Sequence, residues 1–77
     1  MTNRSAVLLR AARSAARLML PLEEATEQLL AAGADASERD LAGAISAAER
    51  LPADDADAAR ARAILRAAYE VRLFPAA

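Results

Sequence analysis

Three arginines near the N-terminus, Arg10, Arg13 and Arg17, are the residues of this 77-residue chain whose type and spacing most clearly suggest chemistry. On a helix they share one narrow stripe, and guanidinium groups in such a stripe can bind the phosphates of nucleic acid or of lipid. The net charge of the chain is −1, however, and none of its basic residues is lysine. We therefore do not expect nucleic acid or a membrane as the partner. A peripheral binder of anionic surfaces that acts through this stripe is the alternative hypothesis.

The same N-terminal segment has two further interpretations. It contains arginine and serine but no acidic residue before Glu23, which is also typical of a cleavable mitochondrial targeting peptide. The simpler interpretation is that the three arginines form an ordinary helix face that is exposed to solvent or lies in an interface. The abundance of alanine, leucine and arginine suggests a GC-rich coding sequence, so we expect a cytoplasmic, bacterial protein.

Two groups of carboxylates could hold a divalent cation. They are Asp54, Asp55 and Asp57, and Glu23, Glu24 and Glu27. The aspartates lack the alternating positions, central glycine and closing glutamate of an EF-hand loop. The glutamates lack the histidine partners of a di-metal site in a helical bundle, because the chain has no histidine. We therefore expect no metal ion and no cofactor, and we assign the aspartates to helix capping and the glutamates to a solvated first turn.

The sequence contains few side chains that could act in catalysis. Histidine, cysteine and tryptophan are absent, so imidazole acid–base chemistry, thiolate nucleophiles, soft-metal sites and disulfides are excluded. A serine or aspartate nucleophile would need an activating base, and only carboxylates are left for that role. The single phenol, Tyr69, lies at the rim of an expected apolar helix face, which indicates packing. We expect no catalytic residue and a protein that is not an enzyme.

Composition indicates the elements that must position these residues. Alanine fills 24 positions and leucine 11, while β-branched and aromatic residues are scarce, and this balance favours helices. No alternating strand pattern is found, and no apolar run approaches the ~18 residues that span a membrane. We predict one all-α domain over residues 1–77, a small bundle of three to four helices with a C-terminal antiparallel helical hairpin. The expected helices cover about 5–20, 21–32, 38–51 and 56–73.

Turn and capping residues indicate where the first two helices begin and end. Asn3 or Ser5 can cap the first helix. Pro21 lacks an N–H and is followed by two glutamates at positions 23 and 24. This predicts that Pro21 is the first residue of a second helix, with a single kinked helix as the alternative. Gly33 is expected just after that helix, in the left-handed conformation that glycine adopts at a C-terminus.

Similar signals bound the last two helices. Ser37 and Asp40 have the spacing of a capping box, with aspartate in place of glutamate, and Asp54 or Asp55 can cap the fourth helix. On the third helix, the spacing places Gly43 on the face opposite the apolar stripe. The core faces of both helices consist largely of alanine, which allows close approach but buries little apolar area per residue.

Charge is unevenly distributed along the chain. Residues 1–20 carry a net charge of +4, residues 21–59 carry −8 and residues 60–77 carry +3. The acidic middle helices can therefore attract the basic outer ones, within one fold or between copies in an oligomer. A core of this size typically contributes only about 3–5 kcal/mol, so self-association or a partner would add stability.

These observations predict a non-enzymatic protein–protein interaction module, such as a small adaptor, chaperone or accessory subunit. It would bind protein, either a second copy or a larger partner, through apolar helical faces. The expected interface combines the wide apolar arc of the first helix with the C-terminal tip, although the tip could instead fold back onto the first helix. Its residues are Val7, Leu8, Leu18, Met19, Leu73 and Phe74.

Overall fold

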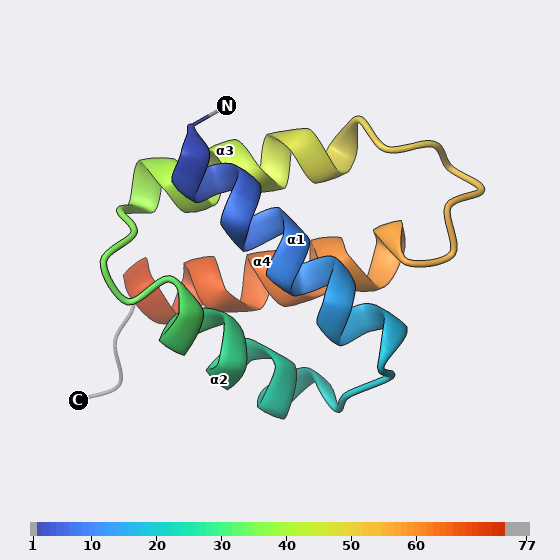
Figure 1. The fold of residues 1–77 in the computed structure, drawn as a ribbon, viewed down its shortest axis with the longest axis horizontal. Helices are drawn as coiled ribbons and strands as arrows, with labels where there is room; N and C mark the ends of the chain where they lie inside the picture. The colour runs from blue at the N-terminus through green and yellow to red at the C-terminus, as the bar shows by residue number, and fades with distance from the viewer. Residues whose placement is uncertain (1, 74–77) are drawn as a thin grey trace.

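Four helices make up the described part of the fold, and Figure 1 shows their arrangement. The computed structural model describes residues 2–73. The helices are α1 (Asn3–Arg17), α2 (Leu22–Ala32), α3 (Glu38–Glu49) and α4 (Ala58–Leu73). α3 and α4 lie side by side and run in opposite directions, and α1 crosses in front of both. α2 packs against α4 and runs parallel to it. The predicted all-α bundle is confirmed, and its radius of gyration of 11.2 Å matches the ~11.5 Å of a compact domain of this length.

The N-terminus of α1 is capped by Thr2, so the prediction of Asn3 or Ser5 was wrong. The Thr2 side chain accepts a hydrogen bond from the N–H of Ser5 at 3.0 Å. Ser5 itself is buried and donates its hydroxyl to the carbonyl of Asp40 at 2.7 Å. α1 therefore begins earlier than expected, and the Ser5 side chain binds α3 instead of capping α1.

The link between α1 and α2 contains the one non-glycine residue with a positive φ among residues 2–73, Met19 at 57°. The N–H groups of Met19 and Leu20 bond to the carbonyls of Ala16 and Ala15 at 3.1 and 3.3 Å. This is the Schellman pattern, which needs a left-handed residue directly after the helix C-cap. Pro21 follows as the N-cap of α2 rather than as its first residue. Two separate helices are formed, and the single kinked helix is excluded.

Gly33 ends α2 without the predicted left-handed conformation, because its φ is −109°. Its missing side chain serves packing instead, since a methyl group built there would overlap Cδ2 of Leu8. Arg72, near the end of α4, donates to the carbonyl of Gly33 at 2.7 Å and also to the carbonyl of Ala36. This guanidinium lies at the negative end of α2, where a cation is stabilising, and it ties α4 to the link between α2 and α3.

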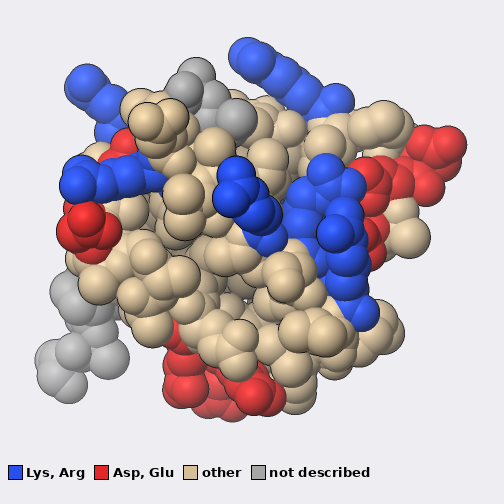
Figure 2. Space-filling model, in the orientation of Figure 1, with Lys and Arg blue, Asp and Glu red and all other residues tan. Residues whose placement is uncertain are grey.

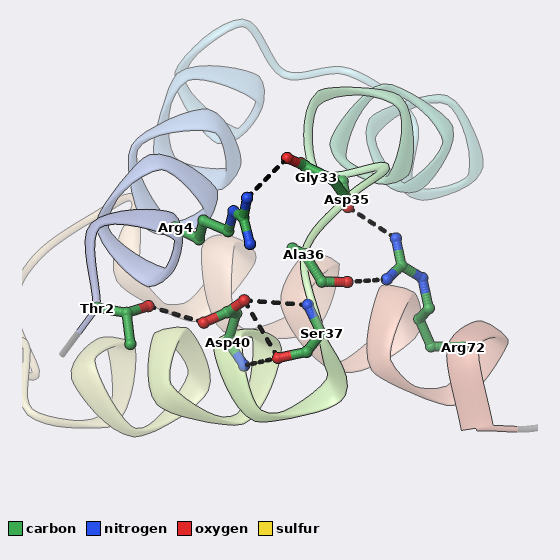
Figure 3. A network of polar contacts seen from close by, with 8 residues as sticks. All are labelled: Thr2, Arg4, Gly33, Asp35, Ala36, Ser37, Asp40 and Arg72. Atoms are coloured by element: carbon green, nitrogen blue, oxygen red, sulfur yellow. Dashed lines mark hydrogen bonds and ion pairs between the residues drawn. The ribbon is translucent and has the colours of Figure 1, made fainter.

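The predicted capping box at the start of α3 is confirmed. Ser37 accepts from the N–H of Asp40 at 3.2 Å, and the Asp40 carboxylate accepts from the N–H of Ser37 at 3.0 Å. The Thr2 hydroxyl donates to the other oxygen of the same carboxylate at 2.8 Å. Figure 3 shows this network, in which one carboxylate joins the N-terminal ends of α1 and α3.

The acidic link between α3 and α4 is bound to α1. Asp55 accepts from the N–H of Asp57 at 3.0 Å and so shapes the turn, while α4 begins at Ala58, later than predicted. Nη2 of Arg13 lies 2.8 Å from Oδ2 of Asp55, and Nε of Arg17 lies 2.8 Å from Oδ2 of Asp57. The basic N-terminal segment and the acidic middle of the chain thus attract each other within one fold.

The core consists mainly of alanine. Of the fifteen buried apolar residues in the described chain, ten are alanine. The larger ones are Leu8, Leu29, Leu41, Ile64 and Leu65. Small side chains let the helices approach closely, and at the crossing of α1 and α3 a methyl group built at Gly43 would lie 2.7 Å from Oγ of Ser5. Gly43 therefore faces α1, and its predicted place on the face away from the core was wrong.

Candidate functional site

Six large apolar side chains are exposed on the described surface. They are Val7, Leu18, Met19, Leu22, Val71 and Leu73. Four of them belong to the predicted interface, and of these Leu18 and Met19 are the most exposed. Leu8, also predicted there, is buried against Gly33 in the core and cannot contribute to a surface. Phe74 lies outside the described residues.

An apolar groove between α2 and α4 was not predicted from the sequence. It has a volume of about 540 Å³ and is lined by Leu22, Glu23, Thr26, Glu27, Leu30, Ala67 and Val71. The Thr26 hydroxyl donates to the Leu22 carbonyl at 2.7 Å within α2, so this residue offers the groove no free hydroxyl hydrogen. Leu22 and Val71 are 51% and 47% exposed, which leaves much of their apolar surface available to a partner.

The groove continues toward the N-terminal end of α4. This second part, of about 530 Å³, is lined by Leu20, Leu22, Ala56, Ala59, Arg60, Ala63 and Ile64. The two parts meet at Leu22, which lines both of them. Four of the lining residues on α4 are spaced four apart and form one row along the helix, about 18 Å long. They are Ala59, Ala63, Ala67 and Val71.

The α2 side of the groove is acidic. Glu23 and Glu27 line it, and Glu24 lies on the same helix. Figure 2 shows the acidic side chains gathered over α2, at the lower edge of the face in view. None of the four ion pairs found within residues 2–73 involves a glutamate of α2. This rim therefore carries uncompensated negative charge.

The predicted anionic-partner face is only partly free. Arg10, Arg13 and Arg17 line a shallow hollow of about 470 Å³ along α1. Arg13 and Arg17, however, are each paired at 2.8 Å, with Asp55 and Asp57 respectively. Arg10 is exposed and takes part in none of the ion pairs of the described chain. Two of the three guanidinium groups are thus neutralised from within the chain, which lowers the positive potential of this face.

Comparison of the chain with protein-family models, with curated proteins and with solved structures found no match. The groove and its acidic rim are therefore the features on which a function can rest. Within the part of the chain that the structure describes, no three histidine, cysteine or carboxylate side chains gather closely enough to hold a metal ion. No helix of that part is long and apolar enough to cross a membrane. Tyr69 is half-buried and packs against the core.

The apolar spacing along α2 and α4 is compatible with burial of Leu22 and Val71, so it gives no indication of a groove at these residues. Leu22 is the first residue of α2, and Val71 lies in the last turn of α4. Neighbouring helices cover a side chain less completely near helix ends, so both remain about half exposed. One sequence signal was present: Ala63 and Ala67 continue a row of small residues beside the core stripe of α4, and such a row leaves room for another helix.

Proposed function

We propose that the protein is a non-enzymatic interaction module that binds a helix of another protein in the groove between α2 and α4. The observation that carries the proposal is the exposure of Leu22 and Val71 along this groove. Helix-in-groove recognition places apolar side chains at intervals of three and four residues against a hydrophobic groove. A contiguous apolar surface rimmed by polar residues is the kind of patch at which proteins bind one another.

The dimensions of the groove fit a short helix. The row of lining residues on α4 is about 18 Å long, which corresponds to about 12 residues of a bound helix. Alanine at positions 59, 63 and 67 lets the backbone of a partner helix approach closely, because the shorter interaxial distances, about 8 Å, need small side chains at the contact. Leu22 and Leu30 on α2 provide the larger apolar surface beside that row.

The charge pairs favour this proposal over the binding of an anionic surface. Arg13 and Arg17 already bond to carboxylates of the link between α3 and α4, so a phosphate would have to displace them. A role as a small adaptor, chaperone or accessory subunit is supported by the groove. A cytoplasmic location in a bacterium belongs to the same proposal, and it is supported by a composition rich in alanine and arginine and without lysine or cysteine.

The test is the selection of helical peptides from a displayed library of sequences about 15 residues long. Selected binders should bind the Ala63→Arg variant at least about tenfold more weakly, because the long side chain would fill the groove. They should still bind Ala42→Arg, the matched change at an exposed alanine of α3. Circular dichroism verifies that both variants fold. Absence of binders, or binders that Ala63→Arg leaves unaffected, would rule the groove out as the binding site.

A further inference from the structure

The acidic rim of the groove indicates the chemistry of its occupant. Glu23 and Glu27 are exposed, line the groove and stand one helical turn apart on α2, which contains no basic residue. We propose that the occupant is a cationic amphipathic helix of a partner protein. Its apolar face fills the groove, and its lysine or arginine side chains contact these two glutamates. This inference rests on the proposed function of the groove and specifies the partner.

Stabilisation of the positive end of α2 explains why a carboxylate stands at position 23, but it does not explain the carboxylate of Glu27. Glu23 lies in the first turn of α2, where a carboxylate stabilises the positive end of the helix. Glu27 lies beyond that turn, where the effect has fallen off. Four carboxylates elsewhere in the described chain each have an arginine nitrogen within 3.1 Å, whereas Glu27 has none. The four are Asp35, Glu49, Asp55 and Asp57. Glu27 is therefore available to a cation from outside.

A helix that lies along α2 can contact both glutamates at once. Residues four apart rise about 6 Å along a helix, so basic side chains at positions i and i+4 of the partner match the spacing of Glu23 and Glu27. The apolar residues of the same helix then meet Leu30 and Val71. Arg60 lines the other part of the groove, where it repels cations. The partner's basic residues are therefore confined to one part of its length, which gives the interaction specificity.

Charge disfavours one symmetric arrangement in which a second copy of this chain covers the groove. If two grooves packed face to face about a twofold axis perpendicular to α2, the two α2 helices would oppose each other. Their glutamates would then come together, and like charges in contact are unfavourable. The arginine-bearing helix α1 cannot enter the groove of another copy as an amphipathic helix, because its apolar residues Leu8 and Ala12 are buried in its own core.

Two synthetic helical peptides of about 15 residues test the inference. They share one leucine face and carry either lysine or glutamate at the flanking positions. Fluorescence anisotropy with the intact protein gives their dissociation constants at low and at high NaCl concentration. The lysine peptide should bind at least about tenfold more tightly at low salt, and the difference should shrink at high salt because ions screen the charge pairs.

Charge-removing variants locate the contact. Glu23→Gln/Glu27→Gln should bind the lysine peptide about tenfold more weakly. The control is Glu38→Gln/Asp54→Asn, which removes the same net charge at two exposed positions outside the groove. It should bind the lysine peptide as the unchanged protein does.

Any result that differs from these expectations overturns a specific part of the proposal. Equal affinity for the two peptides, with loss of both on Ala63→Arg, would overturn the cationic partner and leave the groove function standing. Failure of both peptides, together with an empty library selection, would overturn the groove function as well. Dimerisation in sedimentation equilibrium that Ala63→Arg abolishes would identify a second copy as the occupant and would overturn the cationic helix.

Discussion

The hydroxyl of Thr2 donates to Oδ1 of Asp40 across 2.8 Å, and this bond joins the cap of α1 to the first turn of α3. The hydrogen bond from the backbone N–H of Ser37 chiefly holds the pKa of Asp40 below its ordinary value. The hydroxyls of Thr2 and Ser37 and the charge of Arg4 lower the pKa further, and desolvation of the carboxylate opposes them. Asp40 is therefore bound in its ionised form, and one carboxylate holds two helix ends together (Figure 3).

Stability should fall on strong acidification through Asp40. Its pKa is lower in the folded state than in the unfolded chain, so its contribution is present above about pH 3.9 and is lost as the pH falls through the folded-state pKa. Urea denaturation between pH 7 and pH 2.5 gives the free energy of unfolding of the unchanged protein and of Asp40→Asn. The two free energies should differ most near neutral pH and become equal at low pH. A constant difference would show that Asp40 is not the group responsible, and Asp54→Asn, at an exposed aspartate, is the control.

Gly43→Ala should destabilise the protein, although the same change in an exposed helix stabilises by about 0.5–1 kcal/mol. The new methyl group would lie 2.7 Å from Oγ of Ser5, a buried hydroxyl that is already bonded to the Asp40 carbonyl. We expect a loss of about 1–2 kcal/mol in the free energy of unfolding. In a Ser5→Ala background the nearest remaining atom is Cβ of residue 5 at 3.5 Å, so Gly43→Ala should become neutral or stabilising there. Equal effects in both backgrounds would contradict the close crossing of α1 and α3.

Met19→Gly should stabilise the protein by about 0.5–1 kcal/mol. Met19 holds a φ of 57°, which costs a residue with a Cβ atom about 1–2 kcal/mol, and its exposed side chain has little packing to lose. The greater freedom of glycine in the unfolded chain offsets part of this gain. Leu18→Gly is the control, because Leu18 has a φ of −77° and should only lose stability. Thermal or urea denaturation distinguishes the two, and a destabilised Met19→Gly would argue against the Schellman link.

The pair between Arg13 and Asp55 should contribute more than the pair between Arg4 and Asp35. The side chains are 28% and 20% exposed in the first pair and 59% and 75% exposed in the second. Solvent and salt screen the second pair more strongly. Double-mutant cycles with Arg→Gln and Asp→Asn should give coupling energies of about 1 kcal/mol and below about 0.3 kcal/mol, respectively. A coupling well above about 1 kcal/mol is not expected for the first pair, because both of its side chains keep some contact with solvent. Equal couplings would contradict the difference in burial.

The features predicted correctly from the sequence depend on short-range information. Ser37 and Asp40 are three residues apart, so the capping box is contained in one helical turn and needs no knowledge of the fold. The separation of α1 from α2 follows in the same way from Pro21 and the glutamates behind it. The composition alone favoured helices throughout, and the structure contains four of them in the described residues.

The features that were missed depend on how the helices cross. Periodicity gives each helix one buried face, but α1 covers a second face of α3 at Gly43, and nothing in the spacing of α3 reports this contact. The left-handed position was assigned to Gly33 because glycine adopts it most easily, whereas the chain uses Met19. The groove arises only when α2 lies beside α4, so its lining combines Leu30 with Val71, residues that no local pattern connects.

The alanine-rich core also shapes how stability changes with temperature. The heat-capacity increase on unfolding follows the apolar area that becomes exposed, about 12–15 cal/mol/K per residue in ordinary domains. With ten alanines among the fifteen buried apolar residues of the described chain, the increment should lie at the lower end of that range, about 0.9 kcal/mol/K for 77 residues. A small increment flattens the curve of unfolding free energy against temperature. The groove would then keep its shape over a broad thermal range, even though the greatest stability that the fold reaches is modest.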